Sequence, residues 1–198
     1  MSIFTLERRT EVQEKLLEVG VELIREKGIR KMTISEITAR AGIGKGTFYH
    51  FYQAKEYYAY DVIQYSKNGF RKSLNEIVEK NGGVNRRALE QILTLYSFDG
   101  ENNIISSISA EDQEWLNERL PKEYTLNTPK EEELIPAILG SLQGVKGNPD
   151  IWVLSNMMKI MAIAVENKEM LHEEALDENL RLMRKLLCDY IFGKEEND

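Results

Sequence analysis

The chain has 198 residues, of which 42% are hydrophobic and 30% are charged, a composition that excludes a disordered chain because the apolar side chains suffice to fill a core. The net charge of −7 at first argues against a nucleic-acid-binding protein, but the charge is unevenly distributed. Residues 1–55 hold ten Lys and Arg against seven Glu, and residues 56–198 hold sixteen against twenty-six acidic residues. This pattern fits a basic DNA-binding head on an acidic body; a chance asymmetry is the alternative.

Targeting and cofactor signals are not found in the sequence. The longest purely apolar run, Ile160 to Val165, is far shorter than the roughly 20 residues of a membrane helix. The first residues lack the basic start and apolar run of a signal peptide. The single cysteine, Cys188, cannot form an intrachain disulfide, and no Cys/His cluster has metal-ligand spacing. We therefore expect a cytoplasmic protein with no membrane contact and no cofactor.

The apolar residues predict an all-α fold, because they recur at three- and four-residue steps and only four prolines interrupt the chain. The first helix is expected from about Leu6 to Lys27, ending at Gly28. Its apolar stripe consists of Val12, Leu16, Val19 and Leu23.

The next two helices carry the most informative pattern. Thr33 followed by Glu36 has the spacing of a capping box, which predicts a helix start, and Gly42 is suited to its end. A third helix is expected from about Gly44, with Phe48, Phe51 and Tyr52 turned inward at helical spacing. Two short helices joined by a glycine-marked turn are typical of a DNA-reading helix-turn-helix, here at about residues 33–52.

The polar residues of this segment are predicted to contact DNA. Glycines at the start of the third helix let the backbone approach a phosphate, and the lysines add full charges. The threonine and tyrosine side chains can reach a phosphate or a base edge, and the histidine can donate to a phosphate. The predicted contacts are Thr33, Ser35, Gly44, Lys45, Gly46, Thr47, Tyr49, His50 and Lys55.

Residues 41–56, Ala-Gly-Ile-Gly-Lys-Gly-Thr-Phe-Tyr-His-Phe-Tyr-Gln-Ala-Lys-Glu, resemble the signature of TetR-type transcriptional regulators in order, spacing and residue type. Gly44 stands where serine is usual, and Tyr52 where phenylalanine is common. The resemblance covers roughly residues 8–67. It implies a repressor that binds a palindromic operator as a homodimer and is released by a small molecule. It further implies a DNA-binding domain at 1–54 and a helical effector-binding and dimerisation domain at 55–198.

The body is predicted to be helical at about 55–80, 85–98, 109–120, 131–144, 149–168 and 172–192. The last two helices are apolar around much of their circumference, so each needs covering on more than one side. A second copy of the chain could supply one cover. The predicted dimer seam is Leu154, Met158, Met161, Leu180, Met183 and Leu187.

Aromatic and methionine side chains in the body predict a mostly apolar effector pocket, although ordinary core packing explains any one of them. The candidates are Tyr65, Tyr96, Phe98, Trp115, Trp152 and Met158.

Two other classes of protein remain open. An α-helical enzyme is disfavoured, since the chain has two histidines, one cysteine and no phosphate-binding glycine loop. A helical interaction protein with a helix-turn-helix that no longer binds DNA is disfavoured by the intact Lys45, Tyr49 and Lys55.

Overall fold

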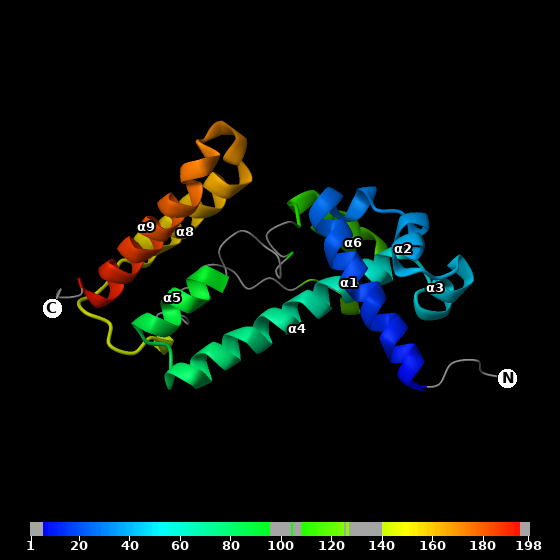
Figure 1. Cartoon of the computed structure of the whole chain (residues 1–198), viewed down its shortest axis with the longest axis horizontal. Helices are drawn as coiled ribbons and strands as arrows, with labels where there is room; N and C mark the ends of the chain where they lie inside the picture. Colours follow the sequence, from blue (N-terminus) through cyan, green and yellow to red (C-terminus); the bar gives the residue numbers. More distant parts are fainter. Residues whose placement is uncertain (1–5, 96–103, 105–107, 125, 127–139, 195–198) are drawn as a thin grey trace. The chain divides into compact units, whose positions relative to one another are not determined.

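The computed structural model describes residues 6–95, 104, 108–124, 126 and 140–194, and these residues form helices and no strand (Figure 1). The predicted all-α fold is confirmed. The α-helices are α1 (Leu6–Lys31), α2 (Ile34–Ala41), α3 (Lys45–Phe51), α4 (Lys55–Asn81), α5 (Arg86–Leu95), α6 (Ala110–Arg119), α8 (Ile151–Glu166) and α9 (Glu173–Phe192). Two short 3-10 turns are η2 (Lys122–Tyr124) and η3 (Lys168–Met170). Most of the helix predicted at 131–144 lies outside the described residues.

The chain divides into two compact units. We call residues 1–71 with 101–127 the head unit, and residues 72–100 with 128–198 the body unit. Helix α4 contributes to both, since the division falls between Arg71 and Lys72. These packing units differ from the functional domains expected at 1–54 and 55–198, because α6 belongs to the head unit although it follows α4 and α5 in sequence. The functional boundary stays a prediction.

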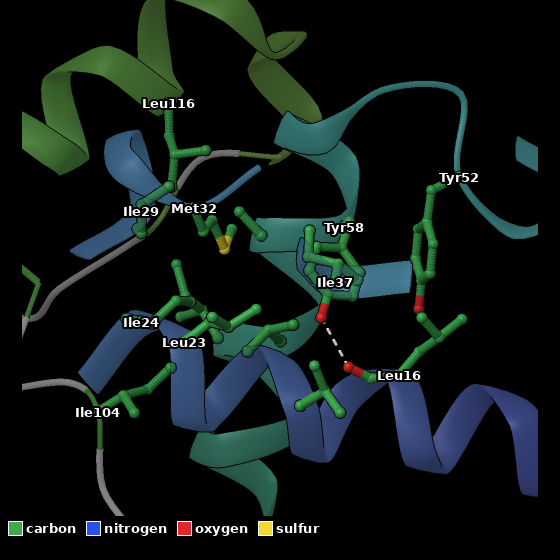
Figure 2. Close-up of a cluster of buried hydrophobic side chains, with 14 of the residues drawn as sticks. Leu16, Leu23, Ile24, Ile29, Met32, Ile37, Tyr52, Tyr58, Ile104 and Leu116 are labelled. Atoms are coloured by element: carbon green, nitrogen blue, oxygen red, sulfur yellow. Dashed lines mark hydrogen bonds between the residues drawn. The ribbon is translucent and has the colours of Figure 1, made fainter. Parts of the chain in front are cut away.

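The core of the head unit is built around α1 and the first half of α4 (Figure 2). Leu16 and Leu23 of α1 are fully buried with Tyr58 of α4. The Tyr58 hydroxyl donates a hydrogen bond of 2.7 Å to the backbone carbonyl of Leu16. Burial raises the pKa of Tyr58, which keeps the hydroxyl protonated and able to donate.

Gly20 makes this close approach between helices possible. A Cβ atom at Gly20 would lie 2.7 Å from the Tyr58 hydroxyl oxygen and would overlap a methyl group of Val62. Both neighbours are fully buried, so neither can move away at low cost. The sequence patterns did not identify this position, since the glycine sits inside an otherwise ordinary amphipathic helix.

The body unit has its own core, formed by α5, α8 and α9. Arg86 of α5 links two of these helices, because its guanidinium donates to the Asp189 carboxylate at 2.9 Å and to backbone carbonyls at the end of α9. Its side chain is only 16% exposed. The body unit therefore combines an apolar interior with an ion pair at its edge.

Across the described ranges, none of the helices has the length and apolar content needed to span a bilayer.

We predict that Gly20→Ala lowers the free energy of unfolding by about 1–3 kcal/mol, because the added methyl group overpacks the interface of α1 and α4. Urea unfolding followed by circular dichroism measures this change. Gly69→Ala in α4 is the matched control, since a Cβ atom there meets no other atom within 4 Å. It should leave stability unchanged or raise it by up to about 1 kcal/mol. Equal effects of the two substitutions would contradict the packing argument.

Candidate nucleic-acid interface

Helix α2 begins and ends as the sequence predicts. The Thr33 hydroxyl accepts a hydrogen bond of 3.2 Å from the Glu36 amide, and the Glu36 carboxylate accepts one of 3.0 Å from the Thr33 amide. The predicted capping box is thus confirmed. Hydrogen bonds from Lys27 and Thr33 lower the pKa of Glu36 to about 2, so the box stays charged at neutral pH. Gly42 ends the helix in the left-handed conformation, with φ 68° and ψ 34°.

Helix α3 presents its inner face to the core. Phe48 is fully buried and its ring packs edge-on against Tyr58 at 5.4 Å between centroids. Tyr52 is buried beside both rings, and Phe51 is partly buried against the same cluster. The inward positions predicted for these three aromatic side chains are confirmed. They fix the rotation of α3 about its own axis.

The opposite face of α3 is open. Gly44, Lys45, Gly46, Tyr49 and His50 are exposed, and Thr47 is half-buried. Tyr49 is 54% exposed although the edge of its ring contacts Phe48. In the described part of the chain, the Lys45 ammonium and the His50 ring form no ion pair or hydrogen bond. A Cβ atom at Gly44 or Gly46 would meet nothing within 4 Å, so the backbone there is accessible.

On α2, only part of the predicted contact surface is free. Ser35 is exposed in the first turn. The hydroxyl of Thr33 is occupied, because it also donates a 2.8 Å hydrogen bond to the Glu36 carboxylate. Nearby basic groups are neutralised as well: Arg40 forms a salt bridge of 2.6 Å to Glu26, and Lys27 one of 2.5 Å to Glu36. Both pairs use glutamates of residues 1–55, so they occupy two of the ten cations of this region and leave its net basic excess unchanged.

Lys55 has a different position from the one predicted. Its ammonium donates hydrogen bonds to three backbone carbonyls, those of Ile29 at 3.3 Å, Arg30 at 3.0 Å and Met32 at 3.2 Å. It also lies 4.8 Å from the centre of the Trp115 ring. An ammonium group has three hydrogens, and all three are engaged. The expectation that Lys55 clamps a phosphate is therefore corrected, because the side chain holds the turn between α1 and α2.

The same turn is held from its other side by α6. Asp112 is 5% exposed, and its carboxylate accepts hydrogen bonds from the Ile29 amide at 3.4 Å and the Arg30 guanidinium at 3.1 Å. Gly28 permits the turn, with φ 78° between the two parts of α1. Asp112 is more than eighty residues from its partners, so no local pattern could have identified it.

The predicted effector-pocket residues are distributed over both units. Tyr65 and Trp115 belong to the head unit, and Trp152 and Met158 to the body unit. Trp115 packs between Lys55 and Arg119, each cation lying 4.8 Å from the ring centre, and Tyr65 and Trp152 are exposed on their helices. Two further candidates, Tyr96 and Phe98, lie outside the described residues. The apolar pocket stays a prediction.

The residues predicted as a dimer seam lie inside a single chain. Four of them are buried in the body-unit core, and the other two methionines pack against it. For the four buried side chains this is a correction, because side chains covered by their own chain cannot also cover a second copy; Met158 and Met183 are only partly buried, and their place in a seam stays a prediction. Other apolar side chains are exposed on these helices. Beside Trp152, they form two rows: Val153, Ile160 and Ile163 on α8, and Leu182, Leu186 and Tyr190 on α9.

We predict that Lys55→Met lowers the free energy of unfolding by about 1–2 kcal/mol, because three carbonyls lose a charged hydrogen-bond donor. Lys45→Met is the matched control, since the exposed Lys45 ammonium holds no backbone group, and it should change stability by less than about 0.5 kcal/mol. Chemical denaturation measures both variants. If the two lysine substitutions have the same small effect, Lys55 does not hold the turn.

Comparisons with known proteins follow this geometry. Residues 16–57, which contain most of α1, all of α2 and α3 and the start of α4, match the family model of bacterial regulatory proteins of the tetR family. The repressor DhaR of Mycobacterium sp. (strain GP1) is 27% identical over 105 residues, 52% of this chain and 53% of that protein. The repressor KstR2 of Rhodococcus jostii (strain RHA1) is 29% identical over 125 residues, 61% of this chain and 58% of that one.

A shorter and closer similarity joins the chain to the regulator YvdT of Bacillus subtilis (strain 168), with 45% identity over 42 residues, 21% of this chain and 22% of that protein. The chain thus spans about half the length of the first of these relatives, and less of YvdT. The N-terminal helix-turn-helix of this chain is thus similar to that of bacterial regulatory proteins of the tetR family.

Proposed function

We propose that the protein is a transcriptional repressor that reads duplex DNA with the exposed face of α3. The observation that carries this proposal is the division of α3 into a buried aromatic side and an open side with Lys45, Tyr49 and His50. A helix whose apolar face is packed on the core and whose polar face is exposed can enter a major groove. The relatives support this reading, since DhaR and KstR2 are named as repressors. Their names give no support to the enzyme hypothesis.

The roles proposed for the side chains follow from their chemistry. Lys45 neutralises a phosphate, and Tyr49 reaches a base edge or phosphate with its ring and hydroxyl. His50 and Thr47 supply further polar contacts, and Ser35 at the start of α2 lies on the neighbouring helix of the motif. Gly44 and Gly46 allow the strand to approach the backbone. Lys55 and Thr33 act indirectly, by holding the turn before α2 and the first turn of α2.

We predict that Tyr49→Ala weakens the free energy of binding to a selected palindromic operator by about 1–3 kcal/mol. Tyr49→Phe removes only the hydroxyl, so its effect measures the contribution of the hydroxyl apart from that of the ring. Lys45→Ala should reduce the slope of log K against log salt by about one, because one phosphate contact is lost. Lys55→Met should leave this slope unchanged. Electrophoretic mobility shift at several salt concentrations measures all variants, with Lys72→Ala in the body unit as control. Operator binding by the Tyr49 and Lys45 variants equal to that of the parent would refute the assignment of α3.

We further propose that the protein acts as a homodimer through the exposed apolar rows of α8 and α9. The six apolar side chains of these rows are between 41% and 62% exposed, and the two helices pack against each other. Water contact with so many large apolar groups is unfavourable, and a second copy related by a twofold axis would cover them. Two heads would then read two half-sites about one helical turn apart or more.

We predict that Leu186→Glu produces a monomer, because it places a charge in the proposed seam. Asp177→Lys, at an exposed position on the other side of α9, should leave the oligomeric state unchanged. Light scattering coupled to gel filtration gives the mass, and circular dichroism checks that both variants are folded. A parent protein that runs as a monomer at micromolar concentration would rule out this seam.

Release from DNA by a small-molecule effector is part of the same proposal. It is supported by the family and by the aromatic side chains of the chain, which suit a mostly apolar ligand. The effector must bind the DNA-competent and DNA-incompetent states with different affinity. A ligand that raises the melting temperature but leaves operator affinity unchanged would not be this effector.

A further inference from the structure

The outer face of α5 in the body unit is hollowed along its length. Three adjoining hollows of about 310, 550 and 850 Å³ share Glu90 as a lining residue. The first lies between α5 and α9, and the third between α5 and the last turns of α4. We call these three hollows together the α5 groove; Arg184 lines the first of them, and Arg87 lines the second and third, on the other side of Glu90. Figure 1 shows α5 beside α9, and the two helices are in contact.

Basic side chains outnumber acidic ones in the lining of the α5 groove. Only two acidic side chains, Glu76 and Glu90, are among its lining residues. The basic ones are Lys80, Arg86, Arg87, Arg181, Arg184 and Lys185. The concentration is notable because the chain as a whole carries a net charge of −7.

Half of these cations are already neutralised. Arg86 and Lys185 share the Asp189 carboxylate, and Arg86 also lies 3.6 Å from Glu90. Arg181 forms a bidentate salt bridge with Glu178, with hydrogen bonds of 2.6 and 2.7 Å. These pairs hold the walls of the groove in place, because each links a long side chain to a fixed partner.

The remaining cations are available to a ligand. In the described part of the chain, Lys80, Arg87 and Arg184 form no ion pair or hydrogen bond. Arg184 is half-buried, so its charge is less screened by water than that of a fully exposed arginine. Counting the carboxylates of Glu76, Glu90, Glu178 and Asp189 against the six cations leaves about two uncompensated positive charges.

We propose that the α5 groove is a binding site for a small organic dianion, such as a dicarboxylate or a phosphate ester. The guanidinium groups of Arg87 and Arg184 match the planar, paired oxygens of carboxylates and phosphates, which a lysine ammonium does not. Two uncompensated charges fit two negative charges on the ligand. This site is independent of the DNA-reading face and of the apolar effector proposed above, and it gives the body unit a ligand class of its own.

The test uses the full chain and three probes: inorganic phosphate, succinate and acetate, titrated at constant ionic strength maintained with potassium chloride. We expect phosphate and succinate to raise the melting temperature with a saturable dependence, and acetate to have no saturable effect. Arg184→Gln and Arg87→Gln should each weaken the binding of both dianions about tenfold, because each removes a charged hydrogen-bond donor. Lys72→Gln is the matched control, an exposed cation of α4 outside the groove.

Two results would overturn the proposal. The first is an equal response of the parent, the arginine variants and the Lys72 control, which would mean general ionic screening. The second is a result in which nonspecific duplex DNA displaces phosphate and the Arg184→Gln variant shows a smaller slope of log K against log salt for DNA binding. That result would mean that the groove contacts nucleic acid. Operator binding by the parent is measured separately, so failure of the regulator hypothesis is distinguishable from failure of the anion site.

Discussion

The position of α3, the helix that we propose reads DNA, depends on the buried contact between Tyr58 and α1. Its hydroxyl reaches the Leu16 carbonyl only because Gly20, one turn further along α1, has no side chain in the way. Its ring also supports Phe48, the one fully buried side chain of α3. One tyrosine of α4 therefore ties the first helix to the third. Because the hydroxyl is buried and bonded, a shift of α4 along α1 would leave a buried polar group without its partner, which is costly.

A second set of contacts fixes the turn that leads into α2. Lys55 binds the carbonyl side of this turn and Asp112 binds an amide on it, so residues 29–32 are held from α4 and from α6 at once. Trp115 packs against the Lys55 ammonium and shields it. Burial lowers the pKa of Lys55, and the nearby carboxylates of Glu56 and Asp112 oppose this shift. The Lys55 ammonium thus stabilises the turn before α2, while the Lys45 ammonium remains available to a binding partner.

The two compact units differ in which charged and apolar side chains they leave exposed. The head unit pairs most of its cations near α2 with acids of α1 and α2, and leaves Lys45 open. The body unit buries the methionine and leucine side chains of α8 and α9 against α5, yet leaves apolar rows exposed on the same two helices. Its α5 groove gathers cations of which half are paired internally. An exposed apolar row suits a second copy of the chain, and an uncompensated basic groove suits an anion.

The sequence by itself determined the local features. Helix starts and ends, the Thr33 capping box, the left-handed Gly42 and the inward Phe48 follow from interactions within four residues, which a linear pattern records. The exposed Lys45, Tyr49 and His50 follow from the same periodicity. Only the tertiary structure decided that Lys55 faces carbonyls rather than solvent, that Asp112 closes the turn, and that Leu154 and Leu187 are covered within one chain. Periodicity identifies which side of a helix is apolar but not which neighbour covers it, because that choice depends on contacts between residues far apart in sequence.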